Sequence, residues 1–195
     1  MSDRAEEDAA SGAGAHELYE SDSRVVVHTK ATGLLARFAH DLEIAAPRIE
    51  ADVEVDGERW TATLRFSVPA LQVVGVLKKG AVDKTVLSPG DRDEIRQRMD
   101  EQVFPRTPFV VVRASGERPS GGTATVELHT GRQTVSLQQR VERRGEGEAM
   151  VEGRVALSLR ALGVKEIKGP LGAFKVHDDV EVHYALCVRP RSAES

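Results

Sequence analysis

Alternation of apolar and polar residues is the main pattern along this chain, and it is clearest between residues 49 and 68. Apolar residues occupy every second position from Ile49 to Val55 and again from Trp60 to Val68. This period of two predicts two strands, each with one buried face and one water-facing face. Asp56-Gly57 lies between them and is a strong hairpin signal. We therefore expect the two strands to pair in an antiparallel sheet with a shared apolar face.

The same alternation returns in the second half of the chain and predicts further strands. About eight strands, each with a single apolar face, are expected to curl and close into an antiparallel β-barrel. The interior of a barrel of this size is filled by side chains or holds one small ligand. In the first strand, Val25, Val26 and Val27 do not alternate with polar residues, so the pattern does not determine which face of this strand points inward. The expected strands cover Tyr19–Lys30, Ile49–Asp56, Trp60–Val68, Phe109–Ser115, Ala124–His129, Val135–Val141, Val151–Leu159 and Val180–Leu186.

One segment, Ser88–Phe104, has helical spacing in place of alternation. Ser88 is a favourable N-cap, Pro89 fits the first helical position, and acidic residues follow in the first turn, where the helix dipole favours them. Pro105 ends the segment. We predict a short helix that covers one end of the barrel, because its apolar stripe is wide enough to dock on only one surface. The stripe consists of Ile95, Met99 and Val103.

Three other segments lack strand alternation. Pro69–Leu87 is expected to be a long connection into the helix, and connections of this length are usually functional or mobile. Leu162–Lys175 is a second connection, rich in glycine and lysine, and Ala31–Phe38 has the spacing of one or two helical turns. If the two connections meet at one barrel end, their lysines form a basic rim suited to an anionic head group; the alternative is scattered, solvated lysines. These lysines are Lys78, Lys79, Lys84, Lys165, Lys168 and Lys175.

Composition places the chain among ordinary globular proteins and excludes several classes of function. Of its 195 residues, 40% are hydrophobic and 30% are charged, which suits a single domain with one core. The net charge of −4 and the aromatic content of 4% argue against a nucleic-acid partner, which requires a basic face or a stacking platform. Cys187 is the one cysteine, so no disulfide within the chain is expected. We interpret it as a small strand residue.

Residues 1–15 differ from the rest of the chain. They are acidic and rich in alanine, glycine and serine, and we expect a disordered tail before a barrel domain at 16–190. The segment lacks the apolar core of a signal peptide, and no later run is long enough to span a membrane. These features predict a cytoplasmic protein that does not span a membrane. The sequence leaves a homodimer open.

The histidines and acidic residues offer only weak candidates for catalysis. His40-Asp41 and His177-Asp178-Asp179 contain the residue types that bind metals, but no two histidines have the spacing of a site on a single element. His129 and His183 fall on the polar face by strand parity. No Gly-x-Ser-x-Gly motif is present, so a serine hydrolase has no support. We expect no cofactor, no metal and no enzymatic activity; a metal-assisted hydrolase using His40 and Asp41 is the weakest alternative.

Three segments together form a recognisable pattern: Lys30–Leu42, which contains His40-Asp41-Leu42; Asp91–Ile95 followed by Pro108–Ser115; and Leu162–Val176 followed by Asp179–Val182. In order and spacing they resemble the YceI-like, polyisoprenoid-binding family. The resemblance spans residues 16–188. It implies an all-β, lipocalin-like barrel with one or two short helices, whose elongated apolar cavity takes an isoprenoid or a fatty-acid-like ligand. Many members of this bacterial family are exported, and this sequence resembles a cytoplasmic branch.

The residues expected to face the barrel interior form one apolar row. The row forms a dry core or, as the resemblance favours, the wall of a cavity, since the small residues Ala62, Ala124 and Gly153 leave space. The leading hypothesis is non-enzymatic binding of an elongated apolar or amphiphilic molecule; the alternative is a stress-response or protein-interaction module with a solid barrel. The expected ligand-binding residues are Trp60, Ala62, Leu64, Phe66, Val126, Leu128, Leu137, Val155, Leu157, Val182, Tyr184, Met99, Phe104 and His40.

Overall fold

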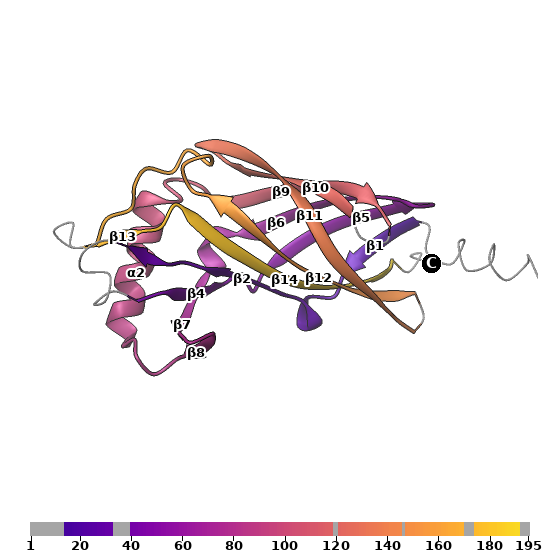
Figure 1. Ribbon diagram of the computed structural model, residues 1–195. Coiled ribbons are helices and arrows are strands. Elements are labelled where there is room, and N and C mark those ends of the chain that lie inside the picture. The colour runs from indigo at the N-terminus through magenta and orange to yellow at the C-terminus, as the bar shows by residue number, and fades with distance from the viewer. Residues whose placement is uncertain (1–13, 33–39, 119–120, 146, 170–173, 192–195) are drawn as a thin grey trace, which may run out of the picture.

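A closed eight-stranded antiparallel barrel forms the body of the protein in a computed structural model (Figure 1). The structure describes residues 14–32, 40–118, 121–145, 147–169 and 174–191. Neighbouring strands pair in the order β1, β5, β6, β9, β10, β11, β12 and β14, and pairing of β14 with β1 closes the barrel. The barrel strands are β1 (Gly14–Leu18), β5 (Ile49–Asp56), β6 (Arg59–Ser67), β9 (Phe109–Glu117), β10 (Gly121–Leu128), β11 (Gly131–Arg144), β12 (Glu148–Ser158) and β14 (Asp179–Pro190).

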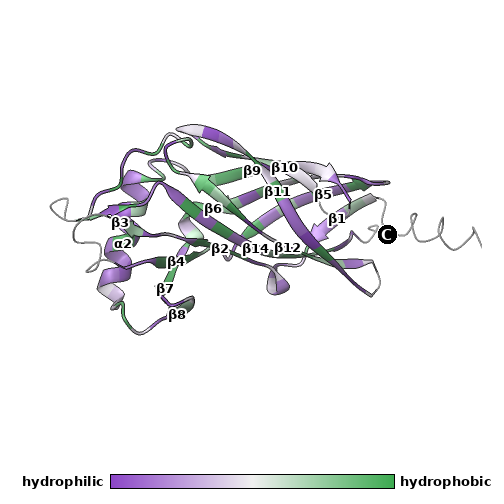
Figure 2. Cartoon of the chain, viewed as in Figure 1, coloured by the Kyte–Doolittle hydropathy of each residue, from purple (hydrophilic) through white to green (hydrophobic). Residues whose placement is uncertain are grey.

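The eight strands expected from alternation are confirmed, and several extend further than expected. Figure 2 shows apolar and polar residues interspersed along them. The expected strand Tyr19–Lys30 is shorter than predicted: it contains the 3-10 helix η1 (Glu20–Asp22) and the strand β2 (Arg24–His28), and the barrel strand β1 before it was not expected. Strand β1 begins at Gly14, inside the segment assigned to the tail, because its backbone pairs with both β5 and β14. Residues 1–13 lie outside the described part of the chain.

The missing alternation at Val25–Val27 has a simple cause. Val25 and Val27 line the barrel interior, whereas Val26 is buried on the opposite face of the same strand. Each face of β2 therefore has a buried valine at the centre of the strand. The helical turns expected at Leu34, Leu35 and Phe38 also lie outside the described residues. The start of that segment, β3 (Ala31–Thr32), is a short strand paired with β13 (Lys175–Val176).

At one end of the barrel the sheet continues as a separate arm. Strand β2 pairs with β14 over Arg24–His28, and the sheet then continues through β4 (Leu42–Ala45), β7 (Gln72–Lys78) and β8 (Ala81–Asp83). Strand β6 pairs with β9, but the chain turns at the 3-10 helix η3 (Val68–Ala70), and β7 pairs with β4 and β8 instead. The chain thus leaves the barrel after β6 and enters the arm at β7.

The helix α2 (Pro89–Gln102) lies at this end of the barrel (Figure 1). Its N-terminus is a capping box: Ser88 Oγ accepts from the Asp91 amide at 3.2 Å, and Asp91 Oδ2 accepts from the Ser88 amide at 2.8 Å. The predicted helix and N-cap are confirmed. Among the described residues, no helix is both long and apolar enough to cross a membrane.

Two arginines attach α2 to the backbone of the arm. The Arg92 guanidinium donates to the carbonyl oxygens of Val74 at 2.8 Å and Lys84 at 2.6 Å. Arg96 donates to the carbonyl oxygens of Leu71 at 3.0 Å and Val68 at 2.7 Å. These bonds satisfy acceptors at the place where β7 has left β6.

The expectation of a loop over Pro69–Leu87 is wrong, because β7 and β8 form a hairpin there. Lys79 and Gly80 connect the two strands, with φ angles of 51° and 83°. Positive φ at both central positions is the geometry of a two-residue type I′ turn. This turn could not be recognised from the sequence, because its first position is a lysine and the usual signal is Asn-Gly or Asp-Gly.

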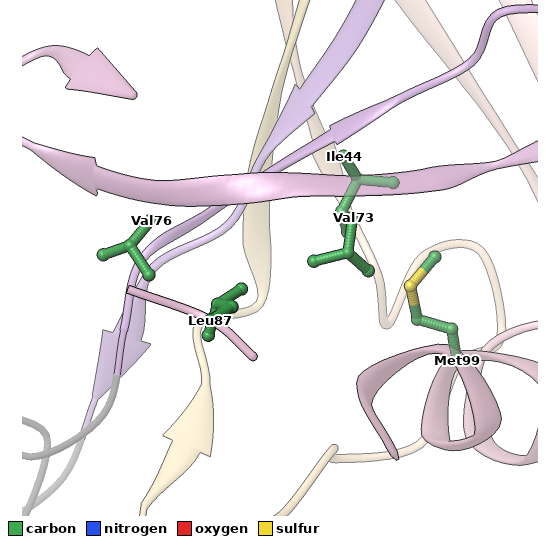
Figure 3. Packing of buried hydrophobic residues seen from close by; sticks show 5 residues of the cluster. All are labelled: Ile44, Val73, Val76, Leu87 and Met99. Atoms are coloured by element: carbon green, nitrogen blue, oxygen red, sulfur yellow. The ribbon is translucent and has the colours of Figure 1, made fainter. Parts of the chain in front are cut away.

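A β-bulge explains why β7 does not alternate. Ile44 pairs with Val73 and Glu43 pairs with Gly75, so Val74 is an extra residue on β7. Val73 and Val76 are consequently three positions apart and yet belong to the same buried cluster. Figure 3 shows this cluster, in which the arm packs against the helix: Ile44, Val73, Val76, Leu87 and Met99.

Candidate functional site

A cavity of about 840 Å³ lies inside the barrel. Inward-facing residues of every barrel strand line it, together with residues of β2, β4 and α2. The lining is mainly aliphatic and aromatic, because the inward positions are the apolar positions of the alternating pattern. The sequence analysis left a dry core and a cavity open, and the structure contains the cavity.

Each residue that the sequence suggested as ligand-binding contributes to the wall of this cavity. Of these suggested residues, four come from β6 and one or two from each of four other barrel strands, because a strand presents alternate residues to the interior. The structure brings together Trp60, Ala62, Leu64 and Phe66 from β6, Val126 and Leu128 from β10, Leu137 from β11, Val155 and Leu157 from β12, Val182 and Tyr184 from β14, Met99 and Phe104 from the helical segment, and His40.

Two aromatic residues occupy space above glycines of neighbouring strands. A Cβ atom at Gly153 would overlap the Tyr184 hydroxyl, and one at Gly122 would lie 2.7 Å from the Trp60 ring. The expectation that Gly153 leaves empty space is therefore wrong, because the Tyr184 ring fills it. Ala62 and Ala124 do line the cavity.

The apolar stripe of α2 covers one end of the cavity, as predicted. Ile95, Met99 and Val103 all line it, and Met99 is buried. Three charged residues of the same helix and His40 also reach the cavity at this end: Asp91, Glu94 and Arg98. Hydrogen bonds from the Ser88 hydroxyl and amide hold the pKa of Asp91 below its usual value. Arg98 Nη2 lies 2.8 Å from Glu94 Oε1, so these two charges are paired.

The basic rim is not formed. Of the six lysines in the two connections, all of which are described, only Lys168 lines the cavity. Lys168 and Lys175 both pair with Glu166, at 3.4 and 2.6 Å, and Lys78 pairs with Asp83 at 2.9 Å. Three of the six lysines are thus paired with two adjacent carboxylates, which sequence spacing did not reveal.

The opposite end of the cavity contains polar residues that the sequence analysis missed. His16, which is 5% exposed, lines the cavity from β1, and its Nδ1 lies 3.0 Å from the carbonyl oxygen of Gly14. Gln139 and Arg118 line the cavity as well. His16 was missed because it lies before the first expected strand. Gln139 was missed although its parity with Leu137 places it on the inward face.

Two polar atoms of the interior have no hydrogen-bond partner among the described residues, namely Trp60 Nε1 and Tyr184 Oη. Burial raises the pKa of Tyr184, so its hydroxyl keeps its proton at neutral pH. Both atoms are buried, as expected of rings that pack over Gly153 and Gly122. The interior is therefore apolar with a small number of polar atoms, which is the usual make-up of a small-molecule site.

Two aspartates of the motifs considered for metal binding, Asp41 and Asp178, accept hydrogen bonds that hold the backbone in place. Asp41 Oδ1 accepts from the Ala31 amide at 2.8 Å. Asp178 accepts from Ser158 Oγ at 2.7 Å and from the Arg160 amide at 2.9 Å. Among the described residues, neither aspartate belongs to a group of side chains that could hold a metal ion. Cys187 is fully buried, as expected of a structural residue.

Burial also explains why Cys187 is a poor nucleophile. Loss of solvation raises the pKa of its thiol to about 11, and its Sγ donates to Glu148 Oε1 at 3.2 Å. A thiol with this pKa is protonated at neutral pH. The interpretation of Cys187 as a small strand residue agrees with this environment.

Fold and cavity together define a closed antiparallel barrel with an apolar interior, and this architecture occurs in solved structures. One is a polyisoprenoid binding domain from Saccharophagus degradans implicated in plant cell wall breakdown, with a TM-score of 0.64 and 12% identity over 91% of this chain and 99% of that chain. Another is BcnA from Burkholderia cenocepacia, with a TM-score of 0.62 and 14% identity over 88% of this chain and 99% of that chain. At these identities the likeness is one of fold. No family model and no curated protein matches the sequence.

Proposed function

We propose that this protein binds one elongated apolar or amphiphilic molecule, an isoprenoid or a fatty-acid-like lipid, inside the barrel. The observation that carries the proposal is the cavity of about 840 Å³ with its aliphatic and aromatic wall. Ligand sites usually measure about 300–1,000 Å³, and an apolar cavity of about 150 Å³ already binds benzene. The shared fold with a polyisoprenoid binding domain supports the same choice of ligand.

Burial of the ligand chain supplies the binding energy in this proposal. Each methylene group removed from water contributes about 0.8 kcal/mol, so a chain of about ten carbons gains about 8 kcal/mol before the cost of association. Affinity should therefore rise with chain length until the cavity is full. The few polar atoms of the wall then select among ligands of similar length.

The alternative of a solid barrel with a functional outer surface has less support. A solid core requires inward side chains that fill the interior, whereas this interior contains the cavity described above. An apolar void of this size without a ligand would be costly, because the atoms of its wall lose packing contacts. We therefore favour a lipid-filled interior over a purely structural barrel.

Mass spectrometry of a solvent extract tests the proposal directly. The protein is purified from its native host and extracted, and we expect a stoichiometric isoprenoid or long-chain lipid. A fluorescent fatty-acid probe, titrated into delipidated protein and displaced by prenols and fatty acids of increasing length, provides the second measurement. An empty extract together with no saturable probe binding would rule out the proposed function.

A further inference from the structure

A cluster of side chains typical of metal ligands lies on the outer face of the barrel, separate from the cavity. His28 on β2 and Glu181 and His183 on β14 each offer one ligand atom, and the three atoms lie within 4.8 Å of one another. None of the three residues lines the cavity. The cluster escaped the sequence analysis because His28 is far from the other two residues along the chain.

The strand register places these side chains together. Glu181 pairs directly with His28, and His183 lies two residues further along β14 and on the same face. The rings of His28 and His183 have centroids 4.4 Å apart and an interplanar angle of 36°. His183 Nε2 also contacts Glu181 Oε1. Two adjacent strands therefore hold all three candidate ligands at fixed positions.

A buried carboxylate orients His28. Glu43 on β4 pairs with His28 on β2, and its Oε2 lies 3.0 Å from His28 Nε2. Glu43 is only 3% exposed, and Arg24 Nη2 donates to its other oxygen at 2.7 Å. An imidazole that donates Nε2–H to a carboxylate keeps a lone pair on Nδ1, and metal-binding histidines usually donate their second N–H to a carboxylate, a backbone carbonyl or water.

We propose that His28, Glu181 and His183 bind a divalent transition-metal ion, with zinc as the best match. Two imidazole nitrogens and one carboxylate oxygen, with a fourth position left to water, form an established ligand set for Zn²⁺. Imidazole ligands favour zinc, copper or nickel over magnesium and calcium. The side chains of His183 and Glu181 are 36% and 42% exposed, so they can separate to admit an ion between them. Glu43 is a positioning residue in this site.

The bound ion would join β2 to β14. These strands meet where β14 exchanges its partner β1 for β2, close to the start of the arm. Because a metal that binds only the folded state stabilises it by mass action, Zn²⁺ should raise the melting temperature. This inference does not depend on lipid binding, since Val182 and Tyr184 of β14 face the cavity and Glu181 and His183 lie outside it.

The test uses the full chain, treated with a chelator and then titrated with Zn²⁺ by calorimetry and with Co²⁺ by absorption spectroscopy. We expect one site per chain and the d–d bands of a four-coordinate Co²⁺ ion. His183→Ala and His28→Ala should weaken Zn²⁺ binding at least tenfold and abolish the Co²⁺ bands. Glu43→Gln should weaken it about 10- to 100-fold, as outer-shell changes do, and leave the bands in place.

Control variants separate this site from general surface binding. His177→Ala removes an exposed histidine outside the cluster and should leave Zn²⁺ affinity unchanged. If His183→Ala does not fold, His183→Gln keeps a polar side chain, and its melting temperature should no longer rise with Zn²⁺. Unchanged Zn²⁺ affinity in both histidine variants, or no saturable binding by the wild type, would overturn the proposal. Loss of Zn²⁺ binding with probe binding retained distinguishes it from the proposed function.

Discussion

Substitution of Leu157 by tryptophan should close the cavity to a ligand without unfolding the barrel. Leu157 is 7% exposed and contributes to the cavity wall from β12. An indole ring at this position would project into space that the ligand chain needs. If it excludes about four methylene groups, binding loses about 3 kcal/mol, which weakens the probe Kd roughly a hundredfold or more. The cost in stability should stay near 1–3 kcal/mol, since the added atoms enter existing space.

Its matched control is Ala156→Trp, on the same strand. Ala156 is exposed and does not line the cavity, so the probe Kd should change little. Leu64→Trp repeats the test from β6, on another part of the wall, with the exposed Thr61→Trp as its control. Circular dichroism verifies folding of each variant. Equal probe affinity in the wild type, Leu157→Trp and Leu64→Trp would refute the reasoning, because the ligand would then bind outside the barrel.

Three further predictions concern stability. Met99→Asp places an unpaired charge in the buried cluster of Figure 3 and should cost about 3 kcal/mol by urea unfolding, whereas Gln97→Asp on the exposed side of α2 should cost little; equal effects would place Met99 in solvent. Gly153→Ala should destabilise by about 2 kcal/mol through overlap with Tyr184, and Gly121→Ala, which meets no atom within 4 Å, should not. The pKa of Asp91 is lowered in the folded state, so its contribution to stability is present above the ordinary value of 3.8 and is lost as pH falls through the lower folded value. Asp91→Asn should therefore make the melting temperature depend less on pH in the acid range. An unchanged dependence of the melting temperature on acid pH would exclude this role.

Seven of the eight barrel strands were predictable, because each of them alternates apolar and polar residues; β1, which begins at Gly14, was not expected. One inward face and a short turn suffice to specify β5 and β6, and the parity of their residues located the cavity wall correctly. The arm was not predictable for a physical reason. The bulge at Val74 adds a residue to β7, so Val73 and Val76 share a side despite their odd spacing. A period of two cannot reveal a strand whose period is broken.

The site was predictable only where a single strand determines it. Residue parity placed Trp60 and Leu64 on the cavity wall, but it could not show that Tyr184 fills the space above Gly153, because that contact depends on the register of two strands. The same holds for His28, whose neighbours Glu43 and Glu181 come from different strands. Contacts between strands distant in sequence depend on the pairing register, and the sequence of one strand alone does not determine that register.

The position of α2 is related to the division of the sheet into the barrel and the arm. β6 and β9 end together, at the pair Ser67 and Phe109, and the chain then turns through η3 into β7 of the arm. A helix cannot hydrogen-bond to a strand edge through its own backbone, since its amides are used internally. The guanidinium groups of Arg92 and Arg96 supply the missing donors instead, each reaching at least two carbonyl oxygens. A planar fork with several N–H groups suits this task better than the single ammonium of lysine. The narrow apolar stripe of α2 is sufficient to hold the helix over the cavity because these arginine hydrogen bonds also attach the helix.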